Sequence, residues 1–235
     1  MRLDQYLSKA LGISRMDAKM LIKKRKITVN ETVVTSANTI IDDSVDIIKK
    51  EEEIITLDKN IYIMLNKPKG YITSTADNSE KTVMELIEHP RKKELFPVGR
   101  LDKDTTGLLL ITNNGALAHE LLAPKKHVSK TYQVRTDKVL SDDDLTKLEN
   151  GVMLDNVLTK PARIMRDSNE NVTYITITEG KYHQVKRMYK SVGLIVIELK
   201  RISFGPLVLD ESLELGEYRN LLEEEITQLE AVIKH

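Results

Sequence analysis

The hydrophobic positions at the start of the chain change from a helical to a strand-like spacing. Leucines between residues 3 and 11 follow a helical period, and Gly12 is suited to end that helix. Ser14 can cap a second helix, whose inner positions include Ala18. From residue 27 onward apolar residues mark short strands at 27–34 and 45–48. This pattern predicts a small module built from two helices and a small sheet.

The remainder of the chain mixes strand and helix patterns without a regular strand–helix–strand rhythm. Strands are expected at 61–66, 108–111, 131–135, 173–178 and 195–199. Helices are expected at 83–87, 116–122, 141–148, 184–192 and 223–233. Asn114-Gly115 is typical of a hairpin turn. The fold class is therefore predicted to be α+β, with a larger mixed, mainly antiparallel sheet flanked by helices following the small α/β module.

A charged run at residues 49–53 and a turn at 58–60 separate these two parts. We therefore expect domains at residues 1–58 and 59–235. The net charge of the whole chain is zero, yet residues 1–30 carry +6 and residues 31–58 carry −6. Such a local basic surface can bind phosphate on an otherwise neutral protein. The alternative is a solvated helix face without a ligand. The candidate contacts are Arg15, Lys19, Lys23 and Lys24.

Composition narrows the setting. There is no Cys, which excludes disulfides and thiolate chemistry and fits a reducing cytoplasm. The first residues contain no apolar run typical of a signal peptide. No apolar stretch approaches the roughly 20 residues that a membrane span requires. We expect a cytoplasmic protein without a membrane partner and, since no dimer seam is evident, a monomer.

Three segments combine residue types that carry chemistry. In the first, Phe96–Leu108, a charged turn containing Asp102 and Asp104 lies between two apolar stretches. The carboxylates could simply satisfy backbone groups of the turn. They could also suggest a metal pair, but no His or third carboxylate stands nearby at ligand spacing, so no metal site is expected.

The second segment is a basic loop that enters a strand and includes Lys125, Lys126, Lys130 and Tyr132. The third segment, residues 179–188, is a strand end followed by basic residues that enter a helix, a common position for phosphate contact. Taken singly, each is equally compatible with a solvated loop or a charged helix end.

Together and in this order, the segments resemble the RsuA-type pseudouridine synthases, the small-subunit branch of the ribosomal RNA enzymes. Gly99–Leu108 resembles the family signature, and Leu65–Gly70 is similar to its first motif. Lys130–Tyr132 and Gly180–Met188 resemble its tyrosine motif and its last motif. Residues 2–34 resemble the RNA-binding fold named after ribosomal protein S-four. The resemblance covers essentially the whole chain.

Two departures from the family pattern stand out. The N-terminal module usually has Gly at the positions of Arg25 and Glu31, so a turn must be formed differently here, with Asn30 suited to the left-handed conformation. The last motif often carries Arg where this chain has Lys186, and an ammonium lacks the planar fork of a guanidinium.

The resemblance implies the reaction and its residues. Pseudouridine formation breaks the N1–C1′ bond of a uridine and joins C5 to C1′, which requires no external atom and hence no cofactor. The resemblance implies Asp102 as the nucleophile, Tyr132 as the residue that stacks on the base, and Lys186 as the cation beside Asp102, with Arg187 as the alternative. A uridine must be extruded from the RNA to react. Candidate RNA contacts from the larger domain are Arg100, Lys125, Lys126, Lys130, Lys181 and Arg187.

The expected partner is 16S rRNA or a small-subunit assembly intermediate, a choice that depends on the resemblance of residues 182–187 to the small-subunit branch. Two alternatives remain: the same chemistry on 23S rRNA, and a non-catalytic rRNA-binding assembly factor. A pure binder has no need of an acid in a basic cleft, which favours the enzyme.

Overall fold

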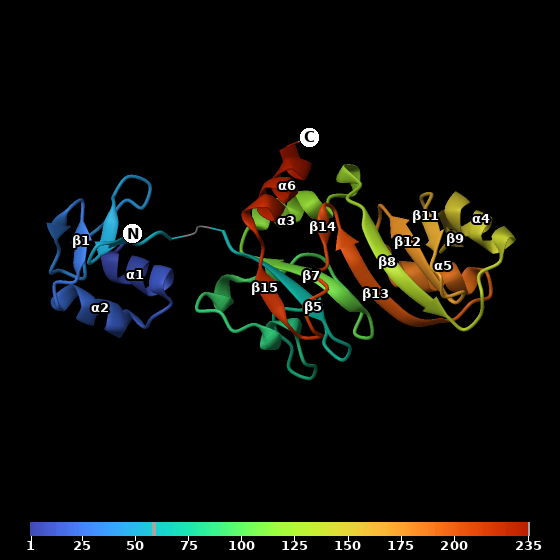
Figure 1. The fold of residues 1–235 in the computed structure, drawn as a ribbon, viewed down its shortest axis with the longest axis horizontal. Coiled ribbons are helices and arrows are strands. Elements are labelled where there is room, and N and C mark those ends of the chain that lie inside the picture. The colour runs from blue at the N-terminus through green and yellow to red at the C-terminus, as the bar shows by residue number, and fades with distance from the viewer. Residues whose placement is uncertain (58–59, 235) are drawn as a thin grey trace. The chain divides into compact units, whose positions relative to one another are not determined.

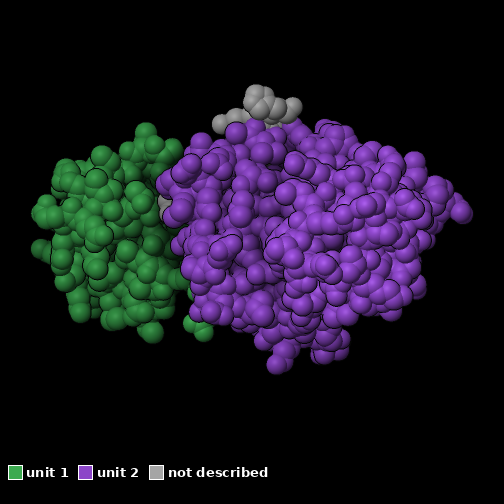
Figure 2. All heavy atoms as spheres, turned by 45° about the vertical axis from the view of Figure 1, so that its right-hand side comes forward, with its two compact units in different colours: residues 1–60, 88–94 green, residues 61–87, 95–235 purple. Residues whose placement is uncertain are grey.

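The computed structural model describes residues 1–57 and 60–234 and divides the chain into two compact units, coloured separately in Figure 2. Unit 1 comprises residues 1–60 and 88–94, and unit 2 comprises residues 61–87 and 95–235. The expected domain boundary between residues 58 and 59 lies outside the described residues. The described part of the chain contains no helix that is long and apolar enough to cross a membrane.

Unit 1 begins with the two helices that the sequence predicts. The helix α1 (Leu3–Leu11) ends at Gly12, whose φ of 66° is left-handed, and Ser14 caps α2 (Arg15–Lys23) by accepting a hydrogen bond from the Asp17 amide. The helices bury leucine, isoleucine and tyrosine side chains in a core shared with the sheet. In the described residues that sheet is antiparallel with order β2-β1-β3-β4, formed by Thr32–Val33, Ile27–Val29, Ile48–Lys50 and Glu53–Ile54.

The strand expected at 45–48 was placed too early, since β3 begins only at Ile48. The Asp46 carboxylate explains the difference: it accepts hydrogen bonds from the Asp42 amide and the Asn30 side chain, which holds residues 42–46 in a turn. The two turns that lack the family's glycines are built from left-handed residues: Arg25 after α2, with a φ of 57°, and Asn30 and Glu31 between β1 and β2, with φ of 51° and 64°. The Asn30 side chain steadies this arrangement by also accepting the Ile47 amide at 2.9 Å.

Unit 2 is organised around one large mixed sheet (Figure 1). Within the described residues it has nine strands, and the strand path is β11-β12-β8-β13-β7-β5-β15, with β14 beside β13 and β6 beside β7. All neighbours are antiparallel except β13 and β7. The strands are β5 (Tyr62–Lys67), β6 (Phe96–Pro97), β7 (Thr106–Thr112), β8 (Lys130–Thr136), β11 (Arg163–Arg166), β12 (Val172–Ile177), β13 (Val196–Phe204), β14 (Leu207–Val208) and β15 (Tyr218–Asn220). A short hairpin of β9 (Met153–Leu154) and β10 (Val157–Leu158) lies outside this sheet.

Helices cover both faces of the sheet, which explains the continuous apolar run at residues 108–111. One core contains residues of α4 (Asp142–Asn150) and α5 (Gln184–Ser191), and the other contains residues of α3 (Gly115–Leu122) and α6 (Glu223–Lys234). Alternate residues of β5 and β7 enter the two cores, and Leu108, Leu109, Leu110 and Ile111 are all fully buried. Three short 3₁₀ helices complete the described elements: η1 (Val83–Leu86), η2 (Lys92–Glu94) and η3 (Pro124–Lys126).

The helices of unit 2 begin close to the predicted positions. One predicted turn, at Asn114-Gly115, is not formed. Ser141 caps α4 as expected. Asn114-Gly115 does not form the expected hairpin turn: the Asn114 side chain accepts the Leu117 amide at 3.1 Å and caps α3. An asparagine suits both roles, and the helix follows directly, so capping prevails.

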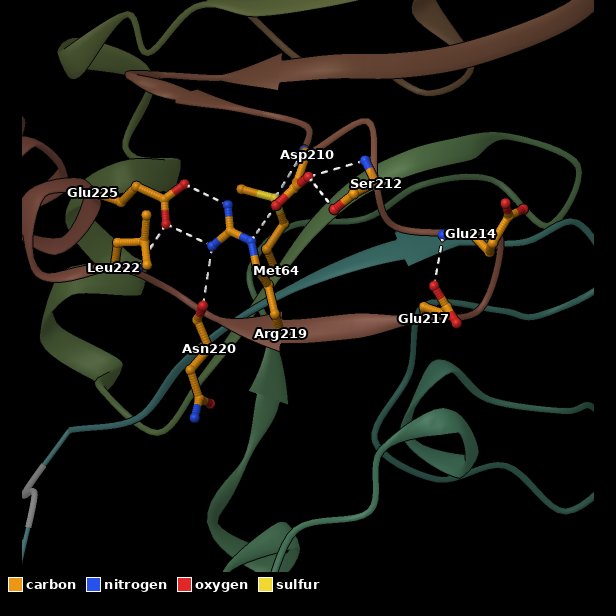
Figure 3. A network of polar contacts seen from close by, with 9 residues as sticks. All are labelled: Met64, Asp210, Ser212, Glu214, Glu217, Arg219, Asn220, Leu222 and Glu225. Carbon is orange, nitrogen blue, oxygen red and sulfur yellow. Dashed lines mark hydrogen bonds and ion pairs between the residues drawn. The ribbon is translucent and has the colours of Figure 1, made fainter.

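An ion-pair network fastens the C-terminal elements to the sheet (Figure 3). Arg219 on β15 donates from Nε to Asp210 at 2.6 Å and from its two terminal nitrogens to Glu225 at 2.8 Å each. Asp210 follows β14, and Glu225 lies in the first turn of α6. Hydrogen bonds from Ser212 and Arg219 lower the pKa of Asp210 to about 2, so the network is fully charged at neutral pH.

Candidate functional site

A buried lysine fixes the backbone of the turn that carries Asp102. Lys67, the last residue of β5, is 0% exposed and donates from Nζ to the carbonyl oxygens of Pro68, Asp102 and Thr105 at 2.9–3.0 Å. Burial lowers the pKa of Lys67 to about 8, against the opposing effect of Asp104 and Asp102. Because one ammonium joins the end of β5 to both sides of the turn, it fixes the backbone from which Asp102 projects.

Gly107 allows the same turn to meet the neighbouring strand. It enters β7 beside Arg201 of β13 with a φ of 101°, and a Cβ atom there would lie 2.2 Å from the Arg201 carbonyl oxygen. Any side chain would therefore push the two strands apart. On the other side, Thr73 fastens Leu101 by donating to its carbonyl oxygen and accepting its amide.

The Asp102 carboxylate lies beside two side chains of the last motif. The Nζ atom of Lys186, in the first turn of α5, is 3.0 Å from Oδ2 of Asp102 and 2.5 Å from Oδ1 of Asp104. The Nε2 atom of His183 is 3.5 Å from Oδ1 of Asp102. Although burial opposes it, hydrogen bonding to Asp104 and Asp102 raises the pKa of Lys186, so this cation stays protonated. Arg187 instead bonds Asp155 at 2.6 Å.

His183 is held at the start of α5 by its backbone and by a neighbouring ring. It is the N-cap residue, with a left-handed φ of 47°, and its ring stacks on Tyr182 with centroids 3.8 Å apart. Tyr182 is 76% exposed, so the stacked pair offers an aromatic surface to solvent beside the carboxylate. Stacked aromatic surfaces of this kind are suited to nucleobases.

A cavity of about 840 Å³ joins these groups to the tyrosine of the second segment. Asp102, Tyr132 and His183 all line it, together with the candidate RNA contacts Arg100, Lys130 and Lys181. Apolar walls come from the connection between β6 and β7 and from β8, β12 and β13. A volume of this size can hold an extruded nucleotide. The cavity thus combines a carboxylate, a tyrosine and several cations within unit 2.

Apart from Lys181, the remaining candidate contacts do not line the cavity. Lys125 is exposed, and Lys126, beside it on η3, has its Nζ 3.6 Å from Glu120. Lys181 is paired with Glu179 at 2.5 Å. In unit 1, Arg15 bonds the buried Asp4 at 2.9 Å, so part of its charge is used within the module. Lys19 and Lys23 of α2 and Lys24 directly after it are exposed.

Sequence reasoning missed three residues of this site: Lys67, His183 and Arg201. Lys67 and His183 stand inside quoted motifs, but nothing in the local pattern indicates that an ammonium is buried or that a ring reaches Asp102. Arg201 lies in β13, where apolar and polar residues do not alternate regularly, so the sequence does not show which face it occupies. Its pairing with Tyr132 across the sheet shows that it lies in the cavity wall.

Comparison with known proteins accounts for this arrangement. Residues 61–191 match the model of the RNA pseudouridylate synthase family, and residues 1–47 match the S4 domain. A crystal structure of a pseudouridylate synthase superposes with a TM-score of 0.69 at 36% identity, covering 97% of this chain and 99% of that chain. The chain therefore belongs to the RNA pseudouridylate synthase family and carries an S4 domain at its N-terminal end.

Its relatives span nearly its whole length. The RNA pseudouridine synthase YtzG of Bacillus subtilis is 43% identical, covering 96% of this chain and 97% of the relative. Proteins named ribosomal small subunit pseudouridine synthase A are 40% identical in Yersinia pestis, with 98% and 99% covered, and 39% identical in Escherichia coli, with 97% and 100% covered. The predicted family, fold class and enzyme class are thus confirmed.

Proposed function

We propose that this enzyme converts one specific uridine of 16S rRNA into pseudouridine, using Asp102 as the nucleophile. The names of the Yersinia and Escherichia relatives support the small-subunit substrate. The ion pair between Asp102 and Lys186 at 3.0 Å is the observation that carries the catalytic assignment, because it places an ammonium beside a carboxylate that lines a cavity of nucleotide size.

The proposed roles follow from the position of each group. Asp102 attacks or electrostatically stabilises C1′ of the extruded uridine while the N1–C1′ bond breaks. Tyr132 stacks on the uracil ring, which suits its 8% exposed position in the cavity wall. Lys186 forms an ion pair with Asp102 and stabilises its carboxylate. Since the reaction neither adds nor removes an external atom, it needs no cofactor or metal. The enzyme should therefore still convert prefolded RNA in the presence of EDTA. Loss of activity in EDTA would contradict the cofactor-free mechanism.

RNA contacts are proposed in both parts of the chain. The domain of residues 59–235 binds around the cavity through Arg100, Lys125, Lys126, Lys130, Lys181 and Arg187, and the domain of residues 1–58 binds through Arg15, Lys19, Lys23 and Lys24. Contacts from two domains raise the effective concentration of each and fix the register on a folded RNA. They also offset the few kcal/mol that base extrusion costs.

We further propose a cytoplasmic monomer that acts on 16S rRNA or on a small-subunit assembly intermediate. The localisation follows from the proposed substrate, since bacterial ribosomes assemble in the cytoplasm. Light scattering of the purified protein tests the monomeric state: a stable dimer would contradict it.

The deciding experiment incubates purified protein with 16S and 23S transcripts, each with and without ribosomal proteins, and then maps pseudouridine. We expect one modified position in 16S rRNA. Modification of 23S rRNA alone would replace the substrate and keep the chemistry. Tight binding of RNA without any product would favour a non-catalytic assembly factor.

A further inference from the structure

Two cations in the cavity wall lie beside Tyr132 on the same face of the sheet. Arg201 of β13 is the direct partner of Tyr132 on β8, and Lys130 stands two residues before Tyr132 on the same strand. Cross-strand partners and alternate residues of one strand share a face. Arg201 is only 2% exposed, yet both cations line the same cavity as Asp102.

Neither cation has a carboxylate partner among residues 1–57 and 60–234. Arg201 donates from Nε to the Leu108 carbonyl oxygen at 2.8 Å and lies 5.2 Å from the ring centroid of Phe204. Its buried Nη2 atom has no hydrogen-bond partner in the described structure. Lys130 donates from Nζ to the Val128 carbonyl oxygen at 2.9 Å and lies 5.5 Å from the same ring. Burial, then the charge of Arg201, lowers the pKa of Lys130 to about 8.

The acidic groups that line the cavity are already paired with other cations. Asp102 pairs with Lys186, and Glu179 pairs with Lys181 at 2.5 Å. A guanidinium cannot lose its proton in a protein, so Arg201 remains a buried charge with an unused donor. Buried donors and charges without partners are strongly unfavourable, and such a site is completed by a ligand with negatively charged oxygen atoms.

We propose that Arg201, together with Lys130, binds the carbonyl oxygens of the reacting uracil and stabilises the negative charge that the ring acquires during the reaction. This inference rests on the proposed function. When the N1–C1′ bond breaks, its electron pair stays with the ring and spreads onto O2 and O4. C5 then supplies the pair for the new bond to C1′, C5 loses its proton to a base, and N1 takes up a proton.

The ring therefore carries this negative charge only after the N1–C1′ bond breaks and before the C5–C1′ bond forms. Donors aimed at O2 or O4 bind this species more strongly than neutral uridine, which is the condition for lowering the barrier. Arg201 thus acts as a catalytic residue for the ring, whereas Asp102 acts on the sugar. The two roles demand opposite charges, and the cavity provides both.

Depth in the cavity distinguishes the base from a backbone phosphate. Arg201 is almost fully buried and directly beside Tyr132, the residue proposed to stack on the uracil. An extruded base enters the pocket, while its phosphates stay with the strand. The exposed Arg100, also in the cavity lining, is placed for a phosphate. The oxygen atoms that reach Arg201 thus belong to the base.

The test compares Arg201→Met, Arg201→Lys and Lys130→Met in the full chain, with Arg163→Met as the matched control. Arg163 lies exposed on β11 and does not line the cavity. The substrate is the rRNA transcript that wild type converts. On it we expect the single-turnover rate of Arg201→Met to fall about 10²–10³-fold, while the dissociation constant for the RNA stays within about threefold of wild type. Arg201→Lys should recover part of the rate, because it keeps the charge, and Arg163→Met should match wild type.

Thiouridine substrates separate a direct contact from a structural role. Replacing O4 or O2 of the target by sulfur weakens a hydrogen bond from Arg201, so one of these substitutions should slow wild type more than it slows Arg201→Met. Equal thio effects in both proteins would overturn the proposal, as would weaker RNA binding with a flattened salt dependence and a normal single-turnover rate, which is the signature of a phosphate contact.

Failure of the variant to fold and failure of the proposed function are each recognisable. If circular dichroism shows Arg201→Met unfolded, the half-buried Lys130→Met carries the same thio comparison, and an unchanged thio effect there overturns the proposal. If wild type modifies no transcript, the proposed function fails and this inference falls with it. If wild type is active and Arg201→Met is equally active, only this inference fails.

Discussion

The Nζ atom of Lys186 lies 3.0 Å from the Asp102 carboxylate and 2.5 Å from that of Asp104, so one ammonium serves two acids of the same turn. The two acids differ in surroundings: the Asp102 side chain is 27% exposed and lines the cavity, whereas that of Asp104 is 70% exposed and does not. This difference makes Asp104 the natural control for Asp102.

Substitution of Asp102→Asn removes the proposed nucleophile but keeps the shape of the side chain. We expect no detectable pseudouridine and nearly unchanged RNA affinity, since the phosphate contacts are untouched. Pseudouridine mapping and filter binding measure the two effects. Asp104→Asn, which loses the same charge nearby, should retain most of the activity; near-normal turnover by Asp102→Asn would refute the nucleophile assignment.

Substitution of Lys186→Met leaves Asp102 and Asp104 beside each other without their shared cation. Asp102 then loses its ion-pair partner in the cavity and keeps a second carboxylate nearby, so the single-turnover rate should fall by roughly 10²-fold. Lys186→Arg should restore much of the rate, because it keeps the positive charge. A rate equal to wild type in Lys186→Met would show that Lys186 does not support Asp102.

Removal of the Lys67 ammonium should loosen the turn that carries Asp102. Lys67→Met leaves the carbonyl oxygens of Pro68, Asp102 and Thr105 without their buried donor, and we expect the free energy of unfolding to fall by about 2–4 kcal/mol. Denaturant unfolding measures the loss, and single-turnover kinetics should show reduced activity. The exposed Lys69→Met is the matched control and should change stability by under about 0.5 kcal/mol. Equal stability of the two variants would contradict the anchoring role.

The proposed RNA contacts of unit 1 predict a change in salt dependence. Combined replacement of Lys19, Lys23 and Lys24 by Ala should weaken rRNA binding and reduce the slope of log K against log salt by up to about 2–3, because fewer counterions are released. Single-turnover rates at saturating protein should stay near wild type. Replacing the exposed Lys138, which lies outside the cavity lining, provides the control. An unchanged slope would mean that α2 does not contact phosphate.

The network around Arg219 predicts how stability responds to acid. The pKa of Asp210 is lowered to about 2 in the folded protein by hydrogen bonds from Ser212 and Arg219, against an ordinary value of 3.8. A lowered folded pKa stabilises the protein above the unfolded value, and this stabilisation disappears as the pH falls from about 4 towards 2. The difference in melting temperature between wild type and Arg219→Met should therefore narrow over that range. A constant difference would exclude a charge-dependent role.

The sequence by itself determined the features that depend on neighbours along the chain. The ends of α1, α2 and α4 follow from Gly12, Ser14 and Ser141, because caps are satisfied within one helical turn. The ordered motifs likewise identified the family, and the turn containing Asp102 was recognisable from them. Local signals were insufficient where one residue suits two roles, as at Asn114, which caps α3 instead of turning a hairpin.

Only the tertiary structure decided which charges meet and which are buried. Lys67 reaches the turn of Asp102 across 35 positions of sequence, and Arg201 reaches Leu108 across 93. Whether a cation is solvated, paired or left as an unused donor depends on groups brought by other strands, and no local pattern records them. The antiparallel pairing of β13 with β8 places Arg201 beside Tyr132, and the parallel contact of β13 with β7, permitted by Gly107, sets the same residue beside the strand that follows the turn of Asp102.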